Sequence, residues 1–351
     1  MIISGPKATS RRQFLSRSAL LTGGIALGIN SAGKLAAQTE TAFSAYQHRR
    51  RADLWGLLGD LPWQHEPAQP KVVSTEDHDT YTLQRLVLDL NGVEPVPALL
   101  LIPKKLQRPA PGALFIHWHA GMYGLGKEQL LKGTSVQPAY APVLAEMGIV
   151  TLAIDSWCFG ERQHDTNGSR GEEDAFKLML WRGQVLWGMM MFDEFRALSY
   201  LASRPEVDPQ RLGVTGMSMG ATKTWWLAAL DPRVRVAIDI CCLTDFDSLI
   251  AAHDIGLHDI GYYVPSLLKE FDTTAINELI VPRPRLSVNG RKDPLTPPAG
   301  VEKIRENLLS LYRQHGRQED CHIELFDCAH EETPEMRSLV IDWMRRYLVA
   351  G

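Results

Sequence analysis

A serine between two glycines is the first feature of this 351-residue chain that could carry chemistry. Residues 216–220 read Gly-Met-Ser-Met-Gly, the pattern G-x-S-x-G, between a strand-like run at 211–216 and a helix-like run at 221–230. In that context the turn is sharp, and its glycines let the end of the strand pack against the start of the helix. The pattern predicts Ser218 as a nucleophile, with the backbone NH of Met219 facing an oxyanion. An ordinary turn serine is the alternative.

A nucleophilic serine needs a base, and the base needs a carboxylate that orients it. In a sheet of this kind the acid and then the base follow the nucleophile, each just after a later strand. Asp293 follows a strand-like run at 284–290, and His330 follows another at 321–327. Order and position therefore predict His330 as the base and Asp293 as the acid.

Other residues compete for these two roles. Asp245 follows the strand-like run at 234–242 and is an alternative acid, while Asp293 could instead form an Asp-Pro turn. His253 and His258 are weaker alternatives for the base, because neither follows a strand. We expect these two histidines to be structural or to line a pocket.

A second oxyanion donor is expected from the loop after an earlier strand. That loop, residues 117–121, reads His-Trp-His-Ala-Gly. The predicted donor is the backbone NH of Trp118 or of His119. The alternative is that the histidines only support the loop through hydrogen bonds.

Together these residues resemble the α/β-hydrolase superfamily, within its dienelactone-hydrolase-like and acetyl-xylan-esterase-like branches. The resemblance covers most of residues 50–350. It implies that Ser218, Asp293 and His330 are nucleophile, acid and base, and that Trp118, His119 and Met219 form the oxyanion region. Dienelactone hydrolases use cysteine as nucleophile. The serine here favours general ester hydrolysis through an acyl-enzyme.

Strand-like and helix-like runs alternate along most of the chain, which is typical of buried parallel strands connected by helices. A hairpin at 81–105, with a turn at Asn91-Gly92, precedes them. The sequence predicts an α/β fold, the α/β-hydrolase fold: a mostly parallel sheet with an N-terminal antiparallel hairpin and helices on both faces. Further strands are expected at 112–118, 149–155, 211–216, 234–242, 284–290 and 321–327, and helices at 140–148, 176–204, 221–230, 301–312 and 335–348.

Aromatic residues near the expected loops suggest the kind of substrate, because aromatic faces suit sugar rings. The substrate is therefore expected to be a small-molecule or carbohydrate ester with a short acyl group. Glu161 and Arg162 could reach the pocket or form a loop salt bridge, and Trp225 and Trp226 could simply pack the nucleophile helix on the sheet. The substrate-binding candidates are Trp157, Glu161, Arg162, Tyr262 and Tyr263; Trp181 and Trp187 are further aromatics.

The N-terminus resembles a bacterial Tat signal. Residues 10–15 read Ser-Arg-Arg-Gln-Phe-Leu, and the apolar stretch at 19–29 is too short to span a bilayer. Ala36 and Ala37 offer a cleavage site. This predicts recognition by the Tat export machinery, a periplasmic or secreted protein and no stable membrane insertion. A basic disordered tail is the alternative.

The predicted organisation has three parts. A Tat-type signal peptide at 1–37 is followed by a helical lead-in at 38–80. The catalytic domain then spans 81–351 and includes an excursion near 245–280 that shapes the pocket.

Composition excludes several classes. Beyond residue 37 the chain has 32 basic and 41 acidic residues, and an acidic protein is a poor partner for nucleic acid. The five cysteines form no convincing disulfide framework and no cysteine–histidine spacing suggests zinc, so buried thiols, no metal and no cofactor are expected. Two other functions stay open: a prolyl-oligopeptidase-like serine peptidase and a hydrolase-like binding protein without catalysis.

Overall fold

The computed structural model of the chain describes residues 28–63, 68–106, 109–119, 121–163 and 168–350, with side chains from residue 41 onward. It comprises two units, Met1–Tyr46 and Gln47–Gly351, and helix α2 (Gly28–Gly56) begins in the first and ends in the second. The predicted twin-arginine pattern lies outside the described residues. Among the helices of the described ranges, none is long and apolar enough to cross a membrane.

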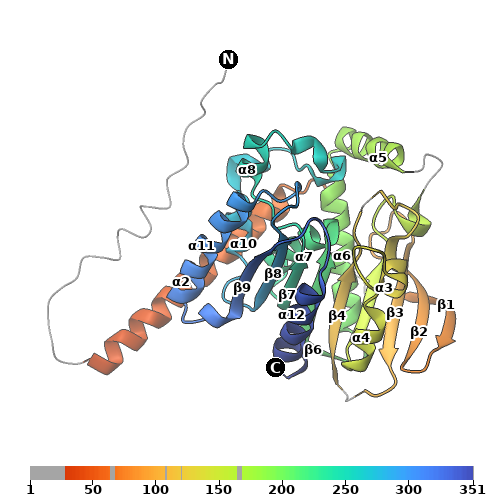
Figure 1. Cartoon of the computed structure of the whole chain (residues 1–351), viewed down its shortest axis with the longest axis horizontal. Helices are drawn as coiled ribbons and strands as arrows, with labels where there is room; N and C mark the ends of the chain where they lie inside the picture. The colour runs from red at the N-terminus through yellow and green to blue at the C-terminus, as the bar shows by residue number, and fades with distance from the viewer. Residues whose placement is uncertain (1–27, 64–67, 107–108, 120, 164–167, 351) are drawn as a thin grey trace. The chain divides into compact units, whose positions relative to one another are not determined.

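One mixed sheet forms the centre of the second unit (Figure 1). Its nine strands, all within the described ranges, lie in the order β1-β2-β3-β5-β4-β6-β7-β8-β9. The pairs from β1 to β5 are antiparallel, and those from β5 through β4 to β9 are parallel. The mostly parallel sheet predicted from the sequence is confirmed. The strands are β1 (Pro70–Asp77), β2 (Tyr81–Leu88), β3 (Val96–Pro103), β4 (Ala110–Ile116), β5 (Val150–Ile154), β6 (Val207–Met217), β7 (Val234–Ile240), β8 (Arg285–Gly290) and β9 (Cys321–Phe326).

The predicted hairpin is formed by β2 and β3, which pair antiparallel from Tyr81 opposite Pro103 to Leu88 opposite Val96. The turn is wider than a two-residue Asn-Gly turn, because the strand pairing ends at Leu88 opposite Val96. Asn91 is buried in this turn, and its Nδ2 donates to Asp193 Oδ1 at 2.8 Å. The sequence did not predict β1, which lies inside the expected helical lead-in. Most of its residues are exposed, and it pairs on one side only.

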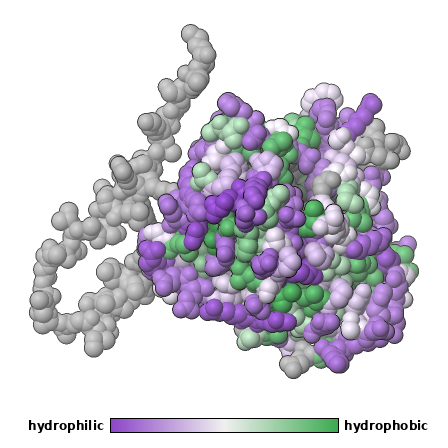
Figure 2. Space-filling view, in the orientation of Figure 1, coloured by the Kyte–Doolittle hydropathy of each residue, from purple (hydrophilic) through white to green (hydrophobic). Residues whose placement is uncertain are grey.

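Helices cover both faces of the sheet (Figure 1). One face packs against α4 (Ala141–Glu146) and α12 (Pro334–Met344), and apolar residues of these helices and of the strands form the core there. The other face packs against α6 (Leu186–Ala202) and α7 (Met219–Leu230). The surface in Figure 2 mixes hydrophilic and hydrophobic side chains, with no single hydrophobic face turned to the viewer.

The single long helix predicted for 176–204 is wrong, because the structure has two helices there. α5 (Ser169–Trp181) ends before Gly183, which has a φ of 77°, and α6 begins at Leu186. The backbone between them is held by a bridge from Gln184 to Gly59. A strand-like contact and a left-handed glycine are incompatible with a continuous helix.

Between β7 and β8 the chain makes an excursion, close to the predicted range of 245–280. Its second 3-10 turn contacts α5, and Figure 1 shows α5 and α8 at the same edge of the sheet. The excursion holds α8 (Phe246–Ala251), η3 (Ile255–Leu257), η4 (Ile260–Tyr262), α9 (Leu267–Glu270) and α10 (Thr273–Asn277). The other helical segments are η1 (Gly126–Glu128), α3 (Gln129–Lys132), η2 (Gly160–Arg162), α11 (Pro298–Gln314), η5 (Gln318–Asp320) and the π-helix η6 (Arg345–Val349).

Candidate active site

Ser218 stands alone between the end of β6 and the start of α7, in a strained backbone conformation. Its φ is 56° and its ψ is −121°, a region that side chains rarely adopt. The chain has no room to relax there, because a Cβ on Gly220 would lie 2.1 Å from the carbonyl oxygen of Ile116 and one on Gly216 would lie 2.5 Å from it. Both glycines are therefore required by the close approach of β4, β6 and α7.

The predicted acid and base lie in direct contact. Asp293 follows β8, His330 follows β9, and Nδ1 of His330 is 2.6 Å from Oδ2 of Asp293. The carboxylate of Asp293 is shielded from solvent, whereas the His330 side chain is 22% exposed. The other oxygen of Asp293 accepts the NH of Leu295 at 2.9 Å. Both carboxylate oxygens are thus held, which fixes the orientation of the imidazole.

Cys241 links this pair to Ser218. The NH of Ser218 donates to the carbonyl oxygen of Cys241 at 2.9 Å. The thiol of Cys241, a nitrogen of His330 and a carboxylate oxygen of Asp293 all lie within 4.8 Å of one another. Burial raises the pKa of the Cys241 thiol well above its usual value, so it remains neutral beside the carboxylate. The structure therefore brings Ser218, Asp293 and His330 to one edge of the sheet.

The competing residues have other partners. Asp245 caps α8 by accepting the NH of Ser248 at 3.1 Å, and it pairs with Lys303 at 3.0 Å. His253 is exposed. His258 lines the pocket beside Ser218, but its Nε2 lies 3.1 Å from the carbonyl oxygen of Leu295. Burial lowers the pKa of His258.

The two residues proposed as second oxyanion donor differ in the structure. The NH of Trp118 is already bound to Oε1 of Gln129 at 2.9 Å, so it cannot face an oxyanion without breaking that bond. His119 lines the pocket together with Ser218 and Met219. Of the two, the NH of His119 is the one compatible with the predicted role.

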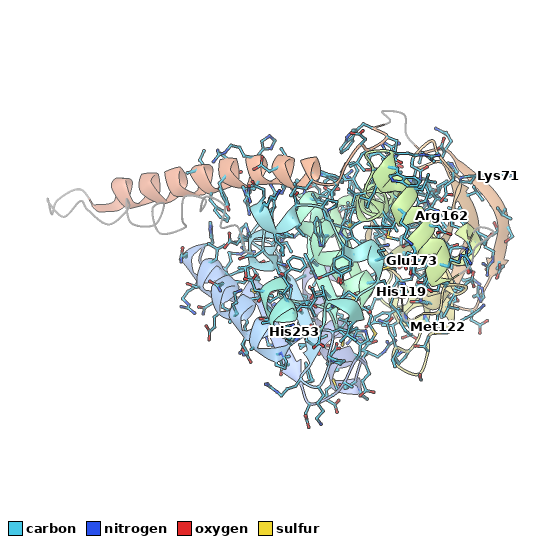
Figure 3. All side chains as sticks on the ribbon, turned by 90° about the horizontal axis from the view of Figure 1, so that it is seen from above. Lys71, His119, Met122, Arg162, Glu173 and His253 are labelled. Atoms are coloured by element: carbon cyan, nitrogen blue, oxygen red, sulfur yellow. The ribbon has the colours of Figure 1, made fainter. Side chains whose placement is uncertain are left out.

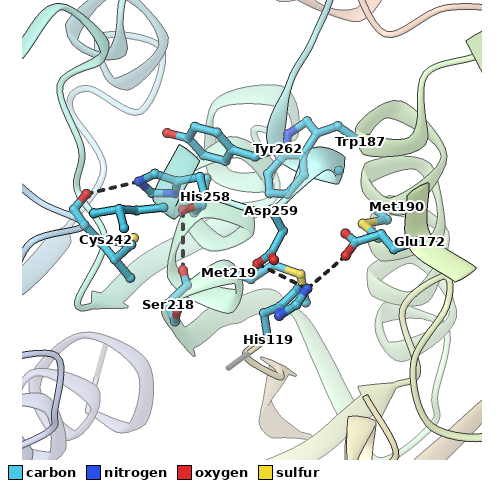
Figure 4. A pocket seen from close by; sticks show the side chains of 14 residues that line it. His119, Glu172, Trp187, Met190, Ser218, Met219, Cys242, His258, Asp259 and Tyr262 are labelled. Carbon is cyan, nitrogen blue, oxygen red and sulfur yellow. Dashed lines mark hydrogen bonds and ion pairs between the residues drawn. The ribbon is translucent and has the colours of Figure 1, made fainter. Parts of the chain in front are cut away.

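The pocket beside Ser218 has a polar wall and an apolar wall (Figure 4). On the polar wall, Nε2 of His119 lies 2.9 Å from Glu172 and 3.1 Å from Asp259. Figure 3 shows His119 between the β1 edge, marked by Lys71, and the excursion, marked by His253. The apolar wall comprises Trp187, Met190, Leu257, Tyr262 and Leu295.

His119 is a hydrogen-bond donor to this wall. Its Nδ1 accepts the NH of Gly121 at 3.1 Å, so the proton is on Nε2, which faces the carboxylates. Tyr123 also donates to Glu172, at 2.8 Å. Burial and the charge of Glu172 raise the pKa of Asp259, while His119 opposes that rise. The side chains of His119, Glu172 and Asp259 have the types and spacing of metal ligands. However, Nε2 of His119 carries a proton here and cannot also bind a metal.

Only one of the five predicted substrate-binding residues, Tyr262, lines this pocket. Arg162 is buried and pairs with Glu94 at 2.6 Å and Asp193 at 2.8 Å, and its guanidinium lies over the ring of Trp157. Glu161 instead pairs with Lys127. Tyr263 donates its hydroxyl to the carbonyl oxygen of Ile255, and Trp181 is 89% exposed on α5.

Trp225 and Trp226 are buried on α7, which confirms the packing alternative for them. The five cysteines are free and buried, as expected. Sequence analysis missed the pocket residues Glu172, Asp259 and Met190. Asp259 carried a signal, because it lies in the stretch that we expected to shape a pocket.

The fold and the strained serine after its central strand define an α/β hydrolase. Residues 31–295 match the family described as Abhydrolase family, so the chain belongs to that family. The Bacillus subtilis (strain 168) protein named "Putative hydrolase YtaP" is 40% identical over 301 residues, which are 85% of this chain and 99% of that protein.

Solved structures share the fold at low sequence identity. The structure described as "a putative acetyl xylan esterase" from Bacteroides fragilis has a TM-score of 0.67 and 18% identity, over 86% of this chain and 83% of that one. A glucuronoyl esterase from Solibacter usitatus has a TM-score of 0.60 and 14% identity, over 88% of this chain and 94% of that one.

Proposed function

We propose that the chain is an exported serine esterase that cleaves short acyl esters, with carbohydrates as the alcohol part. The observation that carries the proposal is the 2.6 Å contact between His330 Nδ1 and Asp293 Oδ2 at the sheet edge that also bears the strained Ser218. A base oriented by a buried carboxylate is what a serine nucleophile needs. The esterase names of the structural relatives support the same reaction class.

In the proposed reaction, Nε2 of His330 takes the hydroxyl proton of Ser218 while Oγ bonds to the ester carbonyl carbon. The NH groups of Met219 and His119 hold the oxyanion. The bond to the alcohol oxygen then breaks, and the alcohol leaves with the proton from His330. Water attacks the acyl-enzyme in the same way, which releases the acid and restores the hydroxyl of Ser218.

The pocket supports a sugar alcohol as the leaving group. The carboxylate oxygens of Glu172 and Asp259 offer acceptors for hydroxyl groups. Trp187 and Tyr262 also line the pocket, where aromatic side chains suit the apolar side of a sugar. Release of acetate from acetylated xylan, absent with deacetylated xylan, would test this part.

The reaction class is tested by initial rates on p-nitrophenyl acetate, butyrate and octanoate. Turnover should be fastest for acetate, and Ser218→Ala should lower it by roughly 10⁴- to 10⁶-fold. Ser199→Ala, on α6 away from the pocket, is the matched control. Wild-type rates equal to those of Ser218→Ala on every ester would overturn the proposal. Faster cleavage of the matched p-nitroanilide would favour a peptidase instead.

Export is a separate part of the proposal and is supported by the twin arginines. Arg11→Lys together with Arg12→Lys should leave the protein in the cytoplasm, whereas Arg17→Lys should not. Cell fractionation and immunoblotting measure this. Equal export of the double variant would contradict the Tat assignment.

A further inference from the structure

A chain of buried polar groups lies behind the candidate oxyanion loop. Lys223 on α7 donates from Nζ to Oγ of Ser156, and the NH of Ser156 donates to Nε2 of His117 at 3.1 Å. Nδ1 of His117 lies 3.0 Å from the carbonyl oxygen of Trp118. All of these side chains are almost completely buried. Nothing in the proposed reaction uses them directly.

The donors and acceptors around His117 follow from the backbone group that it contacts. A backbone NH can only donate, so Nε2 of His117 accepts from Ser156 and carries no proton. Nδ1 therefore carries the proton and donates to Trp118. Burial and the nearby charge of Lys223 lower the pKa of His117 to about 3, which keeps this neutral form at ordinary pH.

Both backbone polar groups of Trp118 are hydrogen-bonded. Its NH donates to Oε1 of Gln129 at 2.9 Å, and its carbonyl oxygen accepts Nε2 of Gln129 at 3.0 Å as well as His117. The carbonyl oxygen of Trp118 and the NH of His119, the candidate oxyanion donor, belong to the same peptide group. That peptide group cannot rotate without losing the two buried hydrogen bonds to the carbonyl oxygen.

Lys223 connects this loop to the other candidate donor. Met219 starts α7, and Lys223 lies one turn later on the same helix. Besides Ser156, Nζ of Lys223 contacts Glu194 on α6 at 3.5 Å. The helix that presents the NH of Met219 is thus tied, through Ser156 and His117, to the loop that presents the NH of His119.

We propose that Lys223, Ser156 and His117 are positioning residues that hold these two NH groups at a fixed separation, ready for the oxyanion. This inference rests on the proposed function, because the hydrogen bonds from Lys223 through Ser156 to His117 would act in the same reaction. A separation set by buried hydrogen bonds before the substrate arrives needs no rearrangement during the reaction.

Ser156→Ala is the smallest change that breaks the hydrogen bond between Lys223 and Ser156. It removes Oγ but keeps the NH that binds His117. Lys223→Met removes the other partner and leaves Glu194 buried without it, so folding is verified by thermal melting. Both variants should lower kcat on p-nitrophenyl acetate by about 10- to 100-fold and change KM less than about threefold. Removing an oxyanion donor outright costs about 10²- to 10³-fold, and misplacing one costs less.

A second readout separates positioning from general destabilisation. A trifluoromethyl ketone forms an oxyanion on Ser218, so its inhibition constant should rise by the same factor as kcat/KM falls. Arg285→Met is the matched control, because it breaks another buried ion pair, with Asp239 at 2.9 Å. The melting temperature of Arg285→Met should fall, while its kcat/KM and its inhibition constant for the ketone stay unchanged.

The possible results lead to different conclusions. A Ser156→Ala variant with unchanged kcat and ketone affinity would overturn the positioning role, even with a lower melting temperature. A loss of kcat without a matching loss of ketone affinity would also overturn it. Wild-type protein without turnover on any ester would instead overturn the proposed function, and the positioning role with it.

Discussion

Nδ1 of His330 and Oδ2 of Asp293 lie 2.6 Å apart, and the carboxylate that holds the imidazole is fully shielded from water. The histidine side chain itself remains partly open to solvent. The buried carboxylate of Asp293 is suited to hold the imidazole in one orientation. The partly exposed imidazole of His330 is suited to exchange protons.

The first prediction concerns this pair. Asp293→Asn should lower kcat on p-nitrophenyl acetate by about 10³- to 10⁴-fold, because the amide no longer selects the required imidazole tautomer. Asp245→Asn is the control, since Asp245 binds Ser248 and Lys303 instead. An equally large loss in Asp245→Asn would show that the acid has been misassigned.

The second prediction concerns the tight turn around the serine. Gly220→Ala should lower the free energy of unfolding by about 1–3 kcal/mol, because its Cβ would meet the carbonyl oxygen of Ile116 at 2.1 Å. Urea denaturation measures the change. In Gly256→Ala the new Cβ meets nothing within 4 Å, so its stability should match that of the wild type.

The third prediction concerns stability at low pH. His117 is neutral in the folded state down to a pKa of about 3, whereas in the unfolded chain it takes up a proton near pH 6.5. The unfolded state therefore binds one more proton between these values, and stability falls as the pH falls. The contribution is about 1.4 kcal/mol per pH unit.

Replacing His117 removes this contribution. From pH 6 to pH 4, the free energy of unfolding of His117→Gln should fall less steeply than that of the wild type. The difference between the two slopes should be about 1.4 kcal/mol per pH unit. Denaturation curves across the pH range measure the two slopes. Parallel slopes would mean that His117 is protonated in the folded state.

The fourth prediction concerns the charge of the pocket. The carboxylates of Glu172 and Asp259 should disfavour an anionic acyl group, so the monoester of p-nitrophenol with succinate should be a poorer substrate than the butyrate. Asp259→Asn should raise the ratio of kcat/KM for succinate over butyrate by about threefold to tenfold. The gain is modest because the Asp259 side chain is 46% exposed and its charge is screened.

Salt and a neighbouring aspartate provide the controls for this effect. The gain should shrink in 0.5 M salt, since screening weakens the repulsion. Asp254→Asn, on the same excursion but outside the pocket lining, should leave the ratio unchanged. A salt-independent gain would indicate a change in shape rather than in charge.

The fifth prediction concerns metal ions. Incubation with EDTA followed by gel filtration should leave the rate on p-nitrophenyl acetate unchanged. The reason is that Nε2 of His119 carries a proton, because Nδ1 accepts the NH of Gly121. Loss of the rate, with recovery on adding one divalent metal, would assign a metal to His119, Glu172 and Asp259.

Much of the fold could be predicted because buried strands and helices leave strong patterns. The hairpin, the alternation and the chain order Ser218, Asp293, His330 all depend on local runs of residues. The edge strand β1 was missed because it pairs on one side and is mostly exposed, so it has no apolar run. The break between α5 and α6 depends on a bridge to Gly59, a contact that local sequence does not reveal.

The pocket was less predictable than the fold. Arg162 was a candidate either for substrate binding or for a salt bridge, and it forms a buried salt bridge with Asp193 on α6. Glu172 and Asp259 come from segments far apart in the chain, and His119 lies in contact with both of them. Such contacts depend on how the loops pack against one another, and the spacing of residues along the chain does not reveal that packing.

Helix α7 has no side facing water, since every residue from Gly220 to Leu230 is buried. Substitutions in it therefore disturb the core. The excursion instead borders the pocket with Leu257, His258, Asp259 and Tyr262, and much of it is exposed. Substitutions in this exposed segment can therefore change the lining of the pocket while the buried helix after Ser218 keeps its packing.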